Sequence, residues 1–275
     1  MVIQHNMNAA NTNRQLGATT TNLGKTTEKL SSGYKINRAG DNAAGLSISE
    51  KMRSQIRGLD QGSTNAQDGI SLIQTAEGAL NETHSILQRM RELAVQSANG
   101  TNQSEDRTAL NDEVTQLKAE VNRIASQTQF NGMNLLDGSF SATKALKLQV
   151  GANGGQTISA VIKDMSMTSI LSGKVSPDVT DFAKATSALS AIDKAIANVS
   201  AQRSSLGAIQ NRLEHTIANT DNTSENLQAA ESRIRDTDIA KEMVKYSKDS
   251  VLQQAAQSML AQANQSTQGV LSLLK

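Results

Sequence analysis

The feature that most constrains this chain is its proline content, because a single proline, Pro177, occurs in 275 residues. Proline lacks the backbone N–H that a helix needs and clashes with the preceding turn, so it is a strong helix breaker. Its scarcity leaves two long stretches in which helices can run without interruption. Aromatic residues make up only 2% of the chain, so the bulky side chains of a deep core are scarce. The sequence therefore predicts thin, elongated layers of helix rather than a thick globule.

Apolar residues recur at the seven-residue spacing of coiled-coil seams. The clearest seam alternates spacings of four and three, and consists of Leu110, Val114, Leu117, Val121 and Ile124. Looser seams are formed by Leu16, Leu23 and Leu30; by Ile56, Leu59, Ile70, Ile73, Leu80, Leu87, Met90 and Leu93; by Phe182, Leu189, Ile192, Ile196, Val199, Leu206, Leu213 and Ile217; and by Leu252, Ala256, Met259, Leu260, Ala263, Val270 and Leu274. Seams this long in one chain are expected to pair with each other. The predicted fold is mainly α, with long antiparallel helices in a rod-like bundle or coiled coil.

Local signals place the ends of the first two helices. The first is expected to end before Gly33, since glycine suits the left-handed position after a helix. The second is expected to begin with Asp41 or Ser47 as its N-cap, and Ser47 and Glu50 have the spacing of a capping box. It is expected to stop near residues 99–100, where asparagine and glycine follow each other.

Two further signals concern later helices. Ser104, followed by the acidic Glu105 and Asp106, is expected to open the helix that carries the clearest seam, because acids favour a helix N-terminus. The polar stretch 219–224 interrupts the heptad spacing that follows Pro177, and the seam resumes at Leu227 and Ile234.

The pattern changes to a period of two in the middle of the chain. Leu146, Leu148 and Val150 alternate with other residues, and Ile158, Ala160 and Ile162 do the same after a glycine-rich turn. Alternation on both sides of such a turn predicts a short β-hairpin.

Composition excludes several classes of function. The net charge of +1 gives no reason to expect a nucleic acid or a membrane surface as partner. Cysteine is absent, and the three histidines, His5, His84 and His215, lie far apart without acidic ligands nearby. No apolar run is long enough to span a bilayer, and the N-terminus lacks the features of a secretory signal. We therefore expect no enzymatic activity, no cofactor and no metal site.

Three segments carry a resemblance to a known family. Residues 31–80 (SSGYKINRAGDNAAGLSISEKMRSQIRGLDQGSTNAQDGISLIQTAEGAL), 126–138 (SQTQFNGMNLLDG) and 233–274 (from RIRDTDIAKEM to VLSLL) resemble bacterial flagellins. The resemblance implies a minimal flagellin without large outer domains. It implies terminal coiled-coil arms of residues 1–40 and 231–275, which order on assembly, a helical rod domain of 41–139 and 178–230, and a β-hairpin insert of 140–177.

The resemblance also implies a function and partners. The chain would be exported without a cleavable signal and would polymerise outside the cell into the flagellar filament. Its self-assembly seam would contain Leu16, Leu23, Leu30, Leu252, Ala256, Met259, Leu260, Ala263, Val270 and Leu274. Family partners are other copies of the chain, an export chaperone, a filament cap protein and hook-associated junction proteins. Contacts with the animal innate receptor Toll-like receptor 5 would fall on Arg89, Leu93 and Glu113, although these residues could equally serve packing or contacts between subunits.

Two alternative hypotheses remain at this stage. A hook–filament junction protein shares terminal helices with flagellins. A cytoplasmic coiled-coil binding module is equally compatible with the heptads and with the missing signal peptide.

Overall fold

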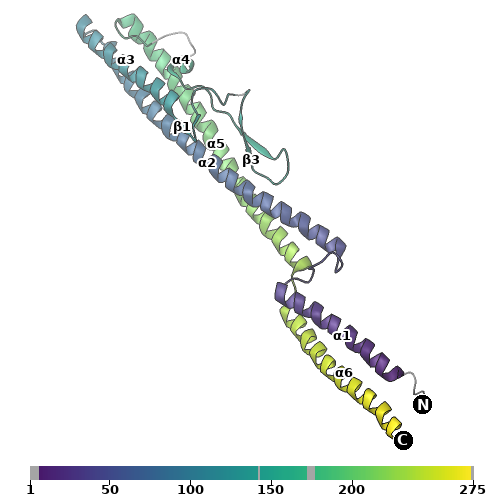
Figure 1. Cartoon of the computed structure of the whole chain (residues 1–275). Coiled ribbons are helices and arrows are strands. Elements are labelled where there is room, and N and C mark those ends of the chain that lie inside the picture. The colour runs from purple at the N-terminus through teal and green to yellow at the C-terminus, as the bar shows by residue number, and fades with distance from the viewer. Residues whose placement is uncertain (1–5, 142, 172–176, 274–275) are drawn as a thin grey trace. The chain divides into compact units, whose positions relative to one another are not determined.

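The computed structural model describes residues 6–141, 143–171 and 177–273. Its elements, in chain order, are α1 (Met7–Ser32), α2 (Ala43–Ser97), α3 (Ser104–Gln127), β1 (Gln129–Phe130), β2 (Met133–Asn134), β3 (Leu146–Gln149), β4 (Thr157–Ala160), α4 (Met167–Ile170), α5 (Phe182–Arg235) and α6 (Ile239–Leu273). The predicted fold class is confirmed, because long helices dominate and small hairpins lie in the middle of the chain (Figure 1).

The chain divides into two compact units. We call Met1–Ser54 with Glu225–Lys275 the terminal unit, and Gln55–Ser224 the central unit. These boundaries differ from the predicted ones, and the three-part division inferred from the family resemblance stays a prediction.

Helices α2 and α5 run antiparallel through the central unit. Arg91 near the end of α2 pairs with Asp193 near the start of α5, with 2.7 Å between Nε and Oδ1. Farther toward the start of α2, Ser63 donates its hydroxyl to Asp221 in the later part of α5 over 3.0 Å. Positions therefore rise along one helix as they fall along the other, as the paired seams predict.

The core of the central unit lies between three helices. Helix α3 contributes the clearest seam, of which Val114 and Val121 are completely buried. Fully buried large side chains of α2 and α5 belong to the same core, and include Leu80, Leu87, Met90, Leu93, Ile192, Val199, Leu206 and Leu213. Burying such side chains removes about 1.5–3 kcal/mol of unfavourable hydration each, so this seam dominates the stability of the unit.

The hairpin of β3 and β4 is confirmed and rests on a row of glycines in α2. Leu146 pairs with Ala160 and Gln149 with Thr157 in an antiparallel register. A Cβ atom added to Gly62 would lie 2.8 Å from the carbonyl carbon of Val150, which is closer than real contacts allow. Gly58 and Gly69 similarly face Ala152 and Leu148. These glycines therefore let the hairpin approach the helix, in addition to weakening its local propensity.

A second hairpin, β1–β2, was not predicted from the residue pattern. Its turn is Asn131–Gly132, and both residues have positive φ, of 49° and 75°. Positive φ at both central positions is the conformation of a type I′ turn, for which Asn-Gly is the preferred sequence. The dipeptide is the signal that could have located this hairpin.

The predicted N-cap of α2 is wrong. The helix begins at Ala43, and Asn42 accepts a hydrogen bond from the backbone N–H of Gly45 over 2.9 Å. Asp41 instead accepts the N–H groups of Arg38 and Asn37, which lowers the pKa of its carboxyl group. Ser47 lies inside the helix. The preceding loop uses the carboxylate of Asp41, so the neighbouring amide caps the helix.

Helix α5 runs continuously from Phe182 to Arg235, through the polar interruption of the seam at residues 219–224. The polar side chains in this stretch reach across to α2 rather than ending the helix. Ser224 donates to Asp60 over 2.8 Å, close to the Ser63–Asp221 contact. A polar interval in a seam can therefore be an interhelical hydrogen-bonded layer. The opening of α3 at Ser104 and the end of α1 at Gly33, with φ of 74°, are confirmed.

The terminal unit contains α1 and α6, which lie side by side (Figure 1). They are antiparallel, because the side-chain amide of Asn6 at the start of α1 donates to the carbonyl of Ala263 late in α6. Among the described residues of this unit, Ile36 is the one buried apolar side chain. Buried positions in α1 are held instead by Thr19 and Thr26, whose hydroxyls bond to carbonyls of their own helix.

A cluster around Tyr34 ties the loop after α1 to the end of α5. The Tyr34 ring lies under the guanidinium groups of Arg235 and Arg53, at 4.6 and 5.4 Å from its centroid. Arg53 also donates to the Tyr34 hydroxyl and pairs with Glu231, both over 3.1 Å. The backbone N–H of Lys35 donates to the Arg235 carbonyl over 2.6 Å. Cation–π contacts and an ion pair thus replace apolar packing here.

Candidate functional site

The three residues that the resemblance assigned to receptor contact lie on neighbouring turns of α2 and α3. Arg89 on α2 donates from Nε to Oε1 of Glu113 on α3 over 3.0 Å. Its Nη1 atom lies 3.1 Å from Glu92, and bonding first to Glu113 and then to Glu92 raises the pKa of Arg89. The side chains of Arg89 and Glu113 are 51% and 42% exposed. They therefore form an accessible charged pair.

Leu93 occupies a different environment. Its side chain is 1% exposed and belongs to the apolar core of the central unit. A partner that binds this stretch therefore meets Arg89, Glu92 and Glu113, while Leu93 supports the helix from beneath. The assignment of these residues to receptor contact stays a prediction.

The residues of the predicted assembly seam are unequally covered. Leu16, Leu23 and Leu30 on α1 are half-buried, and so are Ala256, Leu260 and Ala263 on α6. Leu252 and Met259, in contrast, are 45% and 65% exposed. The Val270 side chain and Leu274 lie outside what the structure describes. The seam thus faces in more than one direction, and its role in assembly stays a prediction.

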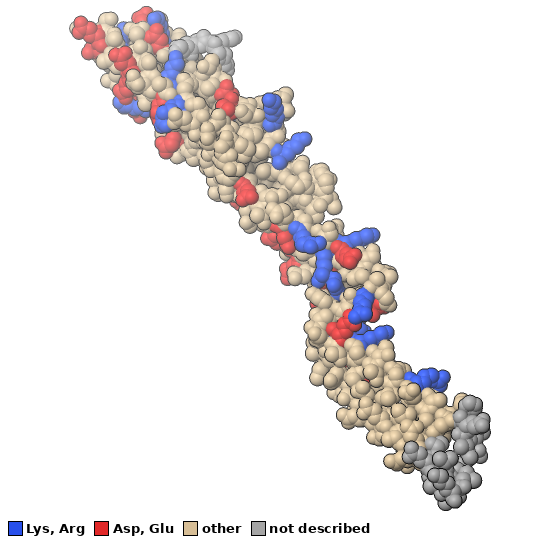
Figure 2. All heavy atoms as spheres, in the orientation of Figure 1, with Lys and Arg blue, Asp and Glu red and all other residues tan. Residues whose placement is uncertain are grey.

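Helix α6 carries most of the exposed large apolar side chains among the described residues. We call this set the α6 apolar face, and it consists of Ile239, Met243, Val244, Tyr246, Val251, Leu252 and Met259. Figure 2 shows that the surface over α1 and α6 is largely uncharged in that view. A groove of about 370 Å³ lies between the two helices, with Leu252 and Met259 on one side and Gln15 and Thr19 on the other. Several exposed large apolar side chains on one helix indicate an interaction site.

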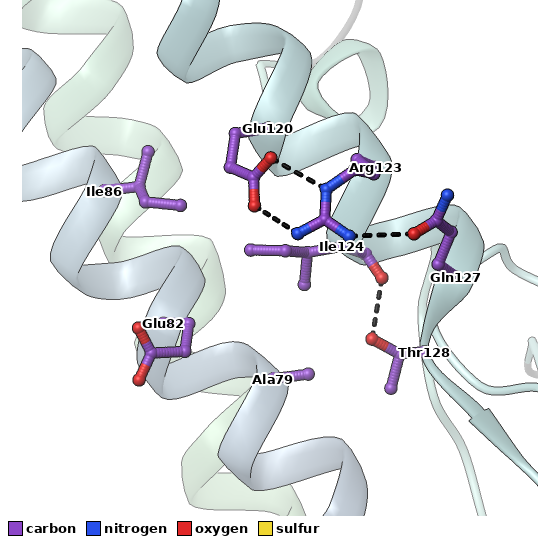
Figure 3. A pocket seen from close by; sticks show the side chains of 8 residues that line it. All are labelled: Ala79, Glu82, Ile86, Glu120, Arg123, Ile124, Gln127 and Thr128. Carbon is purple, nitrogen blue, oxygen red and sulfur yellow. Dashed lines mark hydrogen bonds and ion pairs between the residues drawn. The ribbon is translucent and has the colours of Figure 1, made fainter.

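A second groove, of about 500 Å³, lies between α2 and α3 (Figure 3). We call it the α2–α3 groove, and its lining consists of Ala79, Glu82, Ile86, Glu120, Arg123, Ile124, Gln127 and Thr128. Ala79, Ile86 and Ile124 supply apolar surface. Arg123 is held by Glu120, with 2.8 Å between Nε and Oε2, and by Gln127 over 2.8 Å. This groove was not predicted from the sequence, because its residues come from two helices whose relative rotation no residue spacing predicts.

Neither groove has the constellation of a catalytic centre. Within the described part of the chain, no three His, Asp or Glu side chains are grouped so that they could hold a metal ion. Among the described helices, none combines the length and the apolar content needed to cross a bilayer. The geometry is that of a chain with surfaces for other macromolecules.

Comparisons with known proteins agree with the features described above. Residues 3–141 match the bacterial flagellin N-terminal helical region, and residues 189–274 match the bacterial flagellin C-terminal helical region. A flagellin of Halalkalibacterium halodurans is 58% identical over 275 residues, which cover both chains completely. The crystal structure of Bacillus cereus flagellin has 36% identity and a TM-score of 0.51, and the match covers 57% of this chain and 88% of that one.

A solved putative flagellar hook-associated protein from Vibrio parahaemolyticus is also similar, with a TM-score of 0.59 and coverage of 71% of this chain and 100% of that one. Its sequence identity is 16%, so the likeness concerns the fold alone. The full-length identity to a flagellin distinguishes the chain from the junction-protein and cytoplasmic-module hypotheses. The chain therefore belongs to the bacterial flagellins, and is a structural, non-enzymatic subunit of the extracellular filament that serves motility.

Proposed function

We propose that this flagellin polymerises through its terminal unit, with the α6 apolar face as the principal contact between copies. The observation that carries the proposal is the exposure of that face in the single chain. Val244, Val251 and Met259 are 70%, 65% and 65% exposed, although α6 already packs along α1. A lone subunit therefore leaves this apolar surface in water.

Burying these apolar side chains between copies would contribute favourable free energy to assembly. Each 100 Å² of apolar area removed from water contributes about 2.5 kcal/mol. The α6 apolar face gathers seven exposed large apolar side chains on one helix, whereas a soluble protein normally exposes such side chains singly. A head-to-tail contact whose rotation does not close produces an open helical polymer, which is the form that the filament requires.

Seeded assembly followed by negative-stain electron microscopy tests this proposal. Full-length chain added to short filament seeds is expected to elongate them. Val251→Asp, which places a charge on the α6 apolar face, is expected to abolish elongation while the far-UV circular dichroism of the monomer stays unchanged. Gln254→Asp adds the same charge at an exposed polar position of α6 and serves as the matched control. Equal elongation by both variants would remove the α6 apolar face from the contact.

The same surface supports the proposal that an export chaperone covers α6 before assembly. The exposed apolar side chains of α6 would otherwise promote association inside the cell. A filament cap protein and hook-associated junction proteins are proposed as further partners on the family resemblance. Co-purification of the chain with its chaperone, lost on Val251→Asp and kept on Gln254→Asp, is the expected result for the first of these partners.

Recognition by Toll-like receptor 5 is a second proposed function, favoured by the accessible Arg89–Glu113 pair. An exposed arginine fixed by carboxylates is preorganised for contact, and arginine is enriched among the residues that dominate interfaces. Arg89→Ala is expected to weaken activation of a receptor reporter by purified monomer about 10–30-fold. Arg212→Ala, an exposed position on α5, is the control. A reporter that stays silent with the unmodified monomer would remove this function.

A further inference from the structure

The α2–α3 groove offers a carboxylate that has no ion-pair partner among the described residues. Glu82 stands at its edge and is exposed, and no described Lys or Arg lies within ion-pair distance of it. Glu120, on the facing helix, already binds Arg123. Between the two acids the groove is apolar, with Ala79, Ile86 and Ile124 at its surface (Figure 3). A side chain that binds there must therefore combine an apolar part with a positive charge.

A lysine side chain fits this combination of surfaces. Its four methylene groups cover apolar area while the ammonium group remains at the polar edge. An anion would be repelled by Glu82 and Glu120. A purely apolar side chain would leave Glu82 next to a low-dielectric surface without a partner. The chemistry of the groove therefore points to an exposed lysine without an ion-pair partner, on a strand or helix that fixes its position.

Such lysines lie within and next to the β3–β4 hairpin. Lys144, Lys147 and Lys163 are exposed, and none of them forms an ion pair with a described residue. Lys147 is the most firmly held, because it lies within β3 opposite Ser159. The neighbouring Leu146 and Leu148 pack against the core, so the alternation of the strand turns Lys147 to the outer face. Figure 2 shows blue side chains over this hairpin region.

We propose that Lys147 of one subunit docks in the α2–α3 groove of a neighbouring copy, with its ammonium group at Glu82. The proposal rests on the polymerisation proposed above and adds a second contact that is independent of α6. Groove and lysine belong to different parts of the central unit, because the groove lies between α2 and α3 and Lys147 lies on β3. The contact joins two unlike surfaces, and such a contact can propagate from copy to copy.

The absence of cysteine in the chain permits a direct test by cross-linking. Two full-length variants, Glu82→Cys and Lys147→Cys, are co-assembled on seeds and treated with a short bis-maleimide. A cross-linked dimer is expected in the mixture, and little or none in filaments of either variant alone. Asp68→Cys replaces Glu82→Cys in the matched control, because Asp68 is exposed on α2 outside the groove. Filaments that form without a cross-link specific to the Glu82→Cys mixture would overturn the proposal.

Charge exchange gives an independent second readout. Glu82→Lys or Lys147→Glu alone places like charges together and is expected to raise the critical concentration for elongation about tenfold. The double variant Glu82→Lys, Lys147→Glu restores opposite charges and is expected to return it to within about twofold of the original. A double variant as impaired as the singles would contradict the pairing. Loss of elongation on Val251→Asp, measured separately, concerns the α6 contact and not this one.

Discussion

Heptad seams are buried in the central unit and only partly covered in the terminal unit. In the central unit, Leu80, Leu87 and Met90 are completely buried, whereas Leu16, Leu23 and Leu30 in the terminal unit stay half-exposed at the same kind of spacing. The central unit has a third helix and two hairpins to cover its seam. In the described part of the terminal unit, α1 packs along α6 without a third long helix, so each of the two seams keeps an open side.

The comparison separates local pattern from burial. A heptad predicts that a helix has an apolar side, but the number of neighbours decides whether that side is covered. The terminal unit holds itself together with polar contacts, such as the Tyr34 cluster and the Thr19 and Thr26 hydroxyls. Such contacts contribute less than full burial of leucine, so we expect this unit to gain stability from other copies.

The largest expected effect tests the difference in burial between the two seams, by truncating one seam leucine in each unit. Leu80→Ala is expected to destabilise the monomer by about 2–5 kcal/mol, because it leaves a cavity in a closed core. Leu23→Ala is expected to lower the same unfolding free energy by less than about 1 kcal/mol, since water already reaches the site. Urea denaturation of unseeded protein measures both. Equal losses would mean that the terminal seam is as closed as the central one.

A smaller effect is expected at the α2 glycines against which the β3–β4 hairpin packs. Gly62→Ala is expected to cost about 1–3 kcal/mol, because its Cβ atom would meet the Val150 backbone. Gly78→Ala lies in the same helix with open space around it and should stabilise by about 0.5–1 kcal/mol. Thermal unfolding of the two variants provides the comparison. A change in stability of the same sign for both variants would show that the hairpin does not require glycine at position 62.

The Tyr34 cluster tests whether polar contacts stabilise the terminal unit independently of the central unit. Tyr34→Leu removes two cation–π contacts and is expected to cost about 1–2 kcal/mol. Because the cluster belongs to the terminal unit, the loss should appear in the temperature at which filaments dissociate and not in the melting of the central unit. Tyr34→Phe keeps the ring and should have the smaller effect. A lower melting temperature of the central unit in Tyr34→Leu would contradict this assignment.

The smallest effect is the pH dependence of the region before α5. Hydrogen bonds first from Lys184 and then from Thr180 lower the pKa of Asp178 to about 2. A lowered pKa contributes stability that is complete above the ordinary value of 3.8 and is lost as pH falls toward about 2. The Asp178 side chain is 40% exposed, so solvent screening limits this contribution to less than about 1 kcal/mol. Asp178→Asn should be less stable than the original at pH 6 and equal to it near pH 2, as urea denaturation would measure.

Much of the fold followed from the sequence, where local signals were sufficient. The end of α1 at Gly33, the opening of α3 at Ser104 and the alternation in β3 and β4 depend on neighbouring residues only, and all were predicted correctly. Contacts with distant partners could not be predicted. The polar stretch that contains Asp221 and Ser224 is a gap in the seam by its spacing, and only the structure shows that Ser63 and Asp60 bind to it.

The candidate sites were less accessible to sequence reasoning for the same reason. Leu93 is an ordinary seam residue by spacing and proves to be buried, while Glu82 was not singled out at all. Whether a charged side chain is paired depends on the rotation of one helix against another. No feature of the sequence placed Glu82 beside the apolar surface of Ile86 and Ile124.

Hydrogen exchange followed by mass spectrometry, on monomer and on filament, tests the central claim most directly. The account predicts that amides of α1 and α6 exchange fast in the monomer, while α3 and the parts of α2 and α5 within the central unit exchange slowly. In the filament all of these segments should exchange slowly, because neighbouring copies cover the open seams. Equal protection of the two units in the monomer would contradict the claim that the terminal unit depends on other copies.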